Sequence, residues 1–250
     1  MTPVNGMAEY MLVDPALATL KPSSVDITQA AACITSAPTA FNAVKYIKKD
    51  DRVLILGGSG GVGSSSITLA KLRGASYVAT TSSYDRSKLI DLGADEVINY
   101  KEKNWWEIED YQKNEFDVII DTVGGCNFYN KATLVLKTGK EYGYFIAVTG
   151  DDPRPNISSI CKAMMFMANM PQRYIYTRFY SNHYPQYITL LPYDEVINLK
   201  EVLKLMEDGK LKILLDPSSP LPFTKEGVQE AFRTQGSGHA HGKVLIKISE

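Results

Sequence analysis

Cysteine and histidine are scarce in this chain of 250 residues, which contains three of each. Cys33, Cys126 and Cys161 are far apart, so they form neither a disulfide framework nor a CxxC metal pair, and this usage fits a reducing compartment. The only close pair of histidines, His239 and His241, has no cysteine nearby. Because a zinc site needs about four such ligands together, we expect no metal site.

Long apolar runs and an excess of one charge are also absent. No run approaches the ~20 residues of a membrane span. The formal net charge is -1, which suggests neither a nucleic-acid partner nor an anionic membrane surface. The first ten residues resemble neither a signal peptide nor a transit peptide. We therefore expect a cytoplasmic protein, or a mitochondrial one if a longer N-terminus exists.

Short apolar runs alternate with helical periods from about residue 52 onward. Such alternation predicts βαβ units, and hence a parallel sheet with right-handed crossovers. Ser83 is placed to cap the second helix of the series, and Gly93 to end it. Strands are expected at 52–56, 76–80, 96–100, 116–121 and 142–148, and helices at 62–73, 84–92, 104–114 and 127–136.

The pattern is less regular after residue 150. A methionine-rich segment at 157–170 predicts a helix, for which core packing is the simpler interpretation and a substrate pocket the alternative. Further helices are expected at 194–208 and 224–233, and further strands at 173–180, 211–216 and 243–248.

A glycine-rich loop follows the first predicted strand of this series. Gly58, Gly60 and Gly63 fit the pattern GxGxxG, between a strand and a helix. Glycine lets the backbone N–H groups approach a phosphate, and the start of a helix adds its positive dipole end. This context favours dinucleotide binding over a merely tight turn. No Gly-Lys-Ser/Thr follows, so a Walker loop fits poorly.

The end of the second predicted strand indicates which dinucleotide is bound. An NAD site usually has an acid there, whereas this chain has Ser82 and Ser83, with Arg86 and Lys88 downstream. Hydroxyl groups and cations suit a 2′-phosphate, which a carboxylate would repel. We therefore expect NADP(H) as the cofactor. A solvated helix face is the alternative interpretation of the two basic residues.

Six sequence blocks, in one order, carry a family resemblance from about residue 6 to the C-terminus, although 151–210 matches poorly. Together they resemble medium-chain dehydrogenases/reductases, in particular the zinc-independent quinone oxidoreductases that include reticulon-interacting mitochondrial proteins. The blocks are GMAEYMLVD, AAACITSAPTAFNAV, DRVLILGGSGGVGSSSITLAKLRGA, LGADEVINYKEKNW, FDVIIDTVGG and GHAHGKVLIKI.

The resemblance implies a set of cofactor contacts. His241 stands where the family often has arginine, so its contact with a phosphate would be weaker and pH-dependent. Simpler roles, such as a helix cap for Thr39 or solvated loop positions for the two histidines, stay open. The implied contacts are Ser59, Gly60, Gly61 and Val62 with the pyrophosphate, Ser82 with the 2′-phosphate, Tyr100 near the adenosine, Thr122 near the ribose, Thr39 and Ala147 near the nicotinamide, and His239, Ala240 and His241 from a returning C-terminal loop.

The resemblance also implies a fold and a domain organisation. The fold would be α/β, a Rossmann doubly wound parallel sheet with remnants of a GroES-like β-barrel domain. Residues 1–35 would be the remnant of that domain, 36–210 the NADP-binding Rossmann domain, and 211–250 the return to the barrel. Roughly 100 residues of the barrel would be missing ahead of Met1, a domain's worth. Strand edges left without partners tend to recruit another chain, so we expect a homodimer.

The implied activity is hydride transfer from NADPH to a quinone or an α,β-unsaturated carbonyl compound. The cofactor would supply the chemistry, and solvent could supply the proton, so we assign no catalytic residue. The alternative is a non-catalytic nucleotide-binding protein that acts through partners, because the wall of the substrate cleft is missing.

Overall fold

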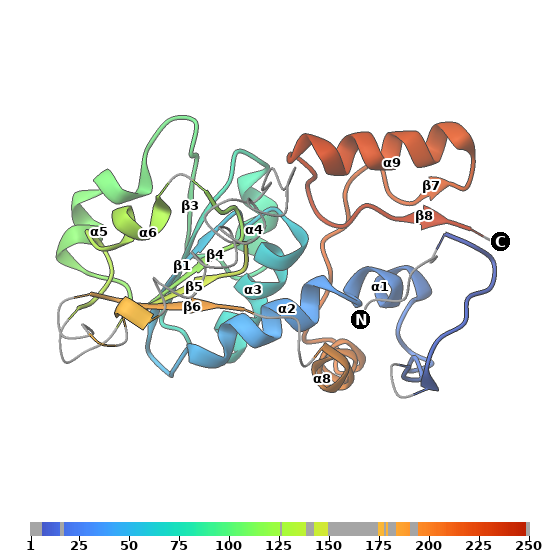
Figure 1. Cartoon of the computed structure of the whole chain (residues 1–250), viewed down its shortest axis with the longest axis horizontal. Coiled ribbons are helices and arrows are strands. Elements are labelled where there is room, and N and C mark those ends of the chain that lie inside the picture. The colour runs from blue at the N-terminus through green and yellow to red at the C-terminus, as the bar shows by residue number, and fades with distance from the viewer. Residues whose placement is uncertain are drawn as a thin grey trace. The chain divides into compact units, whose positions relative to one another are not determined.

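The main sheet of the protein has six parallel strands in the order β3-β2-β1-β4-β5-β6 (Figure 1). This is the order of a Rossmann sheet, and it confirms the predicted parallel α/β architecture. The computed structural model describes residues 7–15, 18–125, 127–138, 143–149, 175–177, 179, 184–190 and 195–248. The strands are β1 (Arg52–Leu56), β2 (Tyr77–Thr81), β3 (Glu96–Ile98), β4 (Val118–Asp121), β5 (Tyr144–Ala147) and β6 (Gln186–Thr189).

The central strands are apolar because both faces of the sheet are covered. All four residues of β4 are buried, as are the last four residues of β1. The register pairs Leu56 with both Thr81 and Asp121, and Asp121 with Ala147. The carboxyl ends of β1, β2, β4 and β5 are therefore level, and ligands of such sheets bind outside these ends.

Helices follow the first strands as predicted, but the expected helix 104–114 is divided between a 3-10 helix and a short α-helix, and the one expected at 127–136 ends at Ala132. One predicted helix cap also differs. The Asp85 carboxylate accepts a hydrogen bond of 2.9 Å from the Ser87 N–H and caps α4, so the predicted cap at Ser83 is wrong. Aspartate and serine are both good caps, so the sequence alone did not show which of Ser83 and Asp85 would begin the helix. These helices are α3 (Gly61–Leu72), α4 (Arg86–Asp91), the 3-10 helix η3 (Trp105–Glu107), α5 (Glu109–Lys113) and α6 (Phe128–Ala132).

One face of the sheet packs against η3, α5 and α6 through a cluster of buried side chains. Tyr111 and Phe116 pack edge to face in it, with ring centroids 4.8 Å apart. The phenol groups of Tyr77 and Tyr111 both donate hydrogen bonds to one carboxylate oxygen of Glu96. Burial and this shared carboxylate raise the pKa of Tyr77 to about 12, and they also raise the pKa of Tyr111.

The segment 173–180 does not form the predicted strand. Residues 175–177 and 179 are helical, and the strand beside β5 is β6 instead. Aromatic and β-branched residues favour strands, but the sheet position next to β5 is taken by Gln186–Thr189, and tertiary pairing overrides local propensity. The predicted helix at 157–170 lies outside the described residues.

The chain divides into two compact units, of which the larger holds the sheet. The other unit comprises residues 1–41, 59–65 and 192–250. Residues 211–216 form only a single bridge, Leu215 with Lys243, where a strand was predicted. The predicted domains 1–35, 36–210 and 211–250 stay a prediction. The remaining elements are α1 (Ile27–Cys33), α2 (Ser36–Ala43), the 3-10 helix η2 (Val44–Tyr46), α8 (Glu195–Glu207), β7 (Leu221–Pro222), α9 (Lys225–Ser237) and β8 (Ile246–Lys247).

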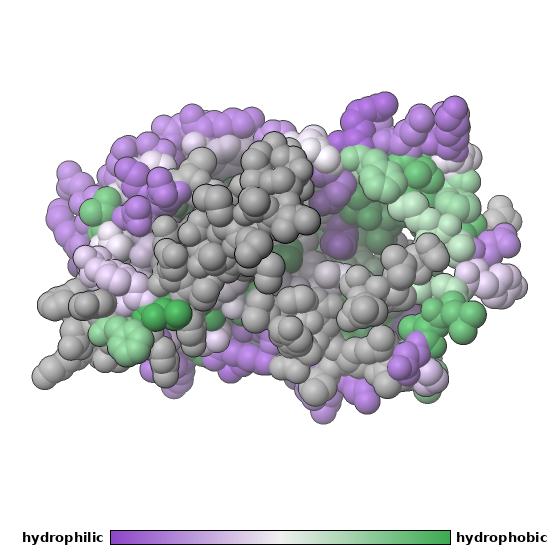
Figure 2. Space-filling model, viewed as in Figure 1, coloured by the Kyte–Doolittle hydropathy of each residue, from purple (hydrophilic) through white to green (hydrophobic). Residues whose placement is uncertain are grey.

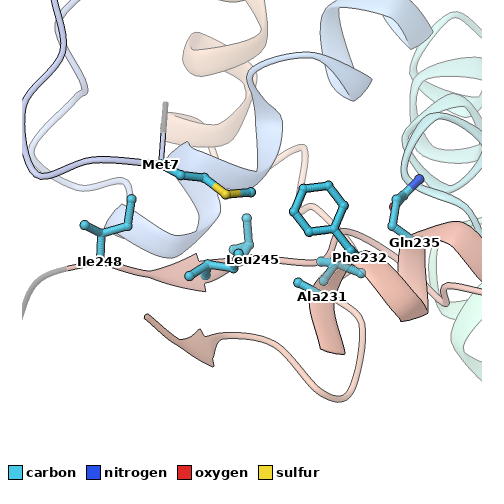
Figure 3. A pocket seen from close by; sticks show the side chains of 8 residues that line it. Met7, Ala231, Phe232, Gln235, Leu245 and Ile248 are labelled. Carbon is cyan, nitrogen blue, oxygen red and sulfur yellow. The ribbon is translucent and has the colours of Figure 1, made fainter. Parts of the chain in front are cut away.

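An apolar cavity of about 300 Å³ lies beside α9 and β8. Met7, Phe232 and Leu245 point toward one another in it (Figure 3), and Gln235 is its one polar lining residue. Phe232 is 62% exposed and Met7 is 48% exposed. Figure 2 shows the apolar side chains gathered near these elements. Among the described residues, no helix is both long and apolar enough to cross a membrane.

Candidate dinucleotide site

The loop after β1 is shaped by two adjacent glycines. Gly57 has a φ of +81°, a conformation that L side chains rarely adopt, and its N–H donates to the Thr81 hydroxyl at 3.0 Å. A Cβ on Gly58 would lie 2.0 Å from the Thr80 hydroxyl oxygen. Gly58 is therefore required for close packing of the loop on β2. Gly57 lies outside the GxGxxG pattern, so the motif alone did not single it out.

The first turn of α3 forms the positive end of a helix without a compensating acid. The Gly60 carbonyl accepts the N–H of Ser64 at 2.9 Å, so the helix begins directly after it. No acidic residue lies in the first turn. The first N–H groups of a helix lack intrahelical acceptors, and together with the dipole they form an anion-binding site. Ser59, Gly60, Gly61, Val62 and Gly63, all predicted contacts, lie in this turn or just before it.

Lys243 lies over this turn, although the sequence analysis did not single it out. A Cβ on Gly61 would lie 2.7 Å from the Lys243 Cδ and 3.3 Å from the Ser36 Cβ. Burial lowers the pKa of Lys243, and among the residues that the structure describes it has no carboxylate partner. A cation beside the positive end of a helix is unfavourable unless an anion joins them. The only sequence signal was a basic residue two positions after His241.

The C-terminal loop belongs to the same unit as this turn. His239 is exposed, whereas Ala240 and His241 are half-buried. The His241 backbone N–H donates to the Asp216 carboxylate at 2.9 Å. Thr39 lies inside α2, where its hydroxyl donates to the Thr35 carbonyl at 2.8 Å. Thr39 is therefore not a helix cap, which was the simpler role left open for it.

The other predicted contacts lie at the carboxyl ends of the strands, in the unit that holds the sheet. Ser82 is 2% exposed, and its hydroxyl oxygen accepts the Tyr84 N–H at 3.0 Å. The Ser83 hydroxyl donates to the Tyr100 hydroxyl at 3.1 Å, which brings two predicted contacts together. Arg86 is exposed at the start of α4.

The charges beside the end of β2 favour an added anion. Hydrogen bonds from Ser87 to the cap Asp85 lower the pKa of that carboxyl group, so it stays ionised and engaged at the helix start. Lys88 places its ammonium 2.7 Å from the Tyr84 hydroxyl. With Arg86 added, residues 82–88 carry two cations, several hydroxyl groups and one capped carboxylate. This composition is suited to a phosphate group.

Thr122 directly follows β4, and Ala147 is the last residue of the neighbouring strand β5. The Thr122 hydroxyl donates to the Leu56 carbonyl at 2.7 Å, so its one proton is used inside the protein. A ligand can therefore only donate to this oxygen. The Asp121 carboxylate fixes the turn after β4 by accepting the N–H groups of Val123 and Gly124. Ala147 is 1% exposed.

A comparison with protein-family models matches residues 92–246 to the family described as zinc-binding dehydrogenase. The chain belongs to this zinc-binding dehydrogenase family. It thus falls within the medium-chain dehydrogenase/reductase superfamily, which confirms the resemblance drawn from the sequence.

Relatives of this chain include named oxidoreductases. The NADPH-dependent alkenal/one oxidoreductase of Arabidopsis thaliana, a chloroplastic protein, is 33% identical over 246 residues, which are 97% of this chain and 53% of the relative. The mitochondrial NAD(P)H oxidoreductase RTN4IP1 of Homo sapiens is 29% identical over 252 residues, covering 97% of this chain and 61% of the relative. The chain therefore spans about half to three fifths of these relatives.

A solved structure of the family has the same fold. The quinone oxidoreductase from Coxiella burnetii superposes with a TM-score of 0.68 at 28% identity, over 92% of this chain and 64% of that chain. By name, the first relative is an NADPH-dependent oxidoreductase of alkenals, the second an NAD(P)H oxidoreductase, and the solved structure a quinone oxidoreductase.

The name of the family implies zinc, but the described residues do not fit a zinc site. Within the described ranges, no group of three or more His, Cys, Asp or Glu side chains could hold a metal ion. Cys33 is buried, and desolvation raises the pKa of its thiol to about 11. Cys126 and Cys161 lie outside the described residues.

Proposed function

We propose that this chain binds NADP(H) and transfers a hydride from NADPH to a quinone or an α,β-unsaturated carbonyl compound. The observation that carries the proposal is the acid-free first turn of α3, which follows the glycine loop and has Lys243 lying over it. An anion-binding turn after the first strand of a Rossmann sheet is where such proteins bind a pyrophosphate. The relatives that use NADPH and reduce alkenals support the reaction class.

Different residues would contact different parts of the cofactor. The amides at 59–63 and the Lys243 ammonium would bind the pyrophosphate, and Ser82, Ser83 and Arg86 the 2′-phosphate. Tyr100 would lie against the adenosine. Thr122 would accept a hydrogen bond from a ribose hydroxyl, because its own proton is already donated to Leu56. Thr39 and Ala147 would lie toward the nicotinamide end, and the loop His239–His241 would return to the cofactor.

The protein's part in the reaction would be to bind and orient. NADPH, when bound, supplies the hydride to an electron-poor carbon. No side chain is assigned as the acid, and solvent would supply the proton to the reduced product. Because Cys33 is protonated at neutral pH and buried, a role as nucleophile is disfavoured.

Purified protein should oxidise NADPH when an enone or a quinone is added. The measurement is the fall in absorbance of NADPH with each acceptor, next to NADH at equal concentration. We expect NADPH to be preferred, because no acid stands at the end of β2. Tight NADPH binding without turnover would support the second candidate, a non-catalytic nucleotide-binding protein. The apolar cavity beside α9 and β8 favours that candidate, because its exposed lining residues offer a surface on which a partner can bind.

We also propose that residues 1–35 and the segment around β8 belong to an incomplete GroES-like barrel. The exposed side chains of Met7 and Phe232 support an unfinished apolar layer. Exposed apolar surface tends to recruit another chain.

Light scattering at micromolar concentration should therefore give the mass of a homodimer, twice the 27.7 kDa of one chain. A single species at the mass of one chain would contradict this expectation. The predicted strand at 173–180 offers no support, since residues 175–177 are helical.

A further inference from the structure

Two segments far apart in the sequence hold each other through paired hydrogen bonds. Residues 214–219 precede β7, and residues 241–245 lead into β8. The Lys243 N–H donates to the Leu214 carbonyl at 2.8 Å, and the Asp216 N–H donates to the Lys243 carbonyl at 3.0 Å. We call this pair of segments the C-terminal clasp. The backbone on both sides of the Lys243 side chain is therefore fixed.

The Asp216 carboxylate is the centre of the C-terminal clasp. Asp216 is 6% exposed. One carboxylate oxygen accepts the His241 N–H at 2.9 Å, and the other accepts the N–H and hydroxyl of Ser218 at 3.0 and 2.7 Å. Burial alone would raise the pKa of Asp216, but these hydrogen bonds outweigh it, so the pKa is lowered and the group is ionised at neutral pH.

Two further contacts leave the clasp little freedom. Ser219 donates its hydroxyl to the Lys243 carbonyl at 3.1 Å and accepts the Leu245 N–H at 2.9 Å. Gly242 has a φ of +115°, and a Cβ there would lie 2.5 Å from the Leu214 carbonyl oxygen. The chain therefore turns sharply between the amide held by Asp216 and the lysine.

We propose that Asp216 is a positioning residue for phosphate binding, because it holds the turn that places Lys243 over the first turn of α3. The inference rests on the proposed NADP(H) function. Asp216 has its carboxylate engaged by His241 and Ser218, so it does not neutralise the lysine directly. It fixes the backbone instead, and the Lys243 side chain packs against Gly61 as a consequence. Without Asp216 the half-buried amide of His241 loses its acceptor, and the turn is free to move.

The test is a double-mutant cycle of four proteins: the unchanged chain, Lys243→Met, Asp216→Ala and the double variant. The NADPH dissociation constant of each is measured by fluorescence titration. Methionine keeps an unbranched apolar chain over Gly61 but removes the charge, and should weaken binding about tenfold. Asp216→Ala should also weaken binding about tenfold when Lys243 is present. In the Lys243→Met background it should change binding less than twofold, because the group that it positions is already gone.

Two control variants and one substitute variant accompany the cycle. Asp216→Asn keeps an acceptor oxygen for the His241 N–H and should stay within about threefold of the unchanged protein. Asp208→Ala removes an exposed carboxylate that pairs only with Lys210 among the described residues, and should have no effect. If Asp216→Ala does not fold, as judged by circular dichroism, Ser219→Ala replaces it, with an expected effect of about threefold and the same dependence on Lys243.

The outcomes separate this inference from the function beneath it. Asp216→Ala overturns the positioning role if it weakens NADPH binding equally with lysine or methionine at position 243, or in neither case. The proposed function still stands in that case, provided that the unchanged chain binds NADPH. An unchanged chain that binds no NADPH overturns both proposals. A loss confined to the background that contains Lys243 supports the positioning role.

Discussion

Replacement of Gly60 by valine is expected to abolish dinucleotide binding while the fold is retained. Gly60 precedes α3 and supplies the first carbonyl of its hydrogen-bond ladder. A branched side chain there would block the approach of a pyrophosphate to the amides at 61–63. Loss of two charge-assisted hydrogen bonds, each worth about 1.5–3 kcal/mol, weakens binding more than about 100-fold. The backbone at Gly60 needs no positive φ, so valine should leave the fold intact.

The measurements are a fluorescence titration with NADPH and a thermal unfolding curve for each protein. Gly236→Val is the matched control, because a Cβ at this helical position meets nothing within 4 Å. It repeats the chemical change away from the site. Normal NADPH binding by the Gly60→Val variant would mean that the loop is only a tight turn.

Replacement of Ser82 by aspartate should reverse the preference between NADPH and NADH. The Ser82 hydroxyl oxygen accepts the Tyr84 N–H, and a carboxylate oxygen can accept it equally, so the local turn should persist. The new charge would repel a 2′-phosphate by about 3 kcal/mol, which corresponds to roughly a 100-fold weaker NADPH affinity. The same carboxylate can accept a hydrogen bond from the 2′-hydroxyl of NADH.

Ser82→Asn separates charge from size in this experiment, since asparagine has nearly the shape of aspartate without its charge. We expect the asparagine variant to keep its preference for NADPH, and both cofactors should be titrated against all three proteins. Equal loss of NADPH affinity in the two variants would mean that bulk at this position is responsible. In that case Ser82 would not contact the 2′-phosphate.

Local sequence was sufficient to predict the strands at the centre of the fold. β1 has the predicted bounds, and β2, β4 and β5 lie within one to two residues of theirs, because each is a short apolar run that is buried on both faces. The segment 173–180 has equally strong strand propensity. Its outcome depended on which residues pair with β5, which is a property of the whole sheet.

The candidate site could be predicted only in part, for a similar reason. The glycine loop and the serines after β2 are contiguous motifs, and their neighbours along the chain indicate a function. Lys243 meets Gly61 across 182 positions of sequence, and Asp216 meets His241 only through a backbone amide. Contacts between residues so far apart in the sequence cannot be predicted from periodicity or motif spacing. The sequence analysis therefore considered His241 as the phosphate ligand of this loop, and the lysine two positions later was missed.

The two phenol groups that donate to Glu96 should make the stability of the sheet fall at alkaline pH. Tyr77 and Tyr111 can donate to this carboxylate only while they are protonated. Their pKa values are raised in the folded protein, so their contribution to stability is complete below the ordinary tyrosine value of 10.0. It falls away as the pH rises from there toward 12, the value for Tyr77. Since Tyr77 begins β2 and Glu96 begins β3, the end of the sheet opposite the candidate site should be the part that base loosens first.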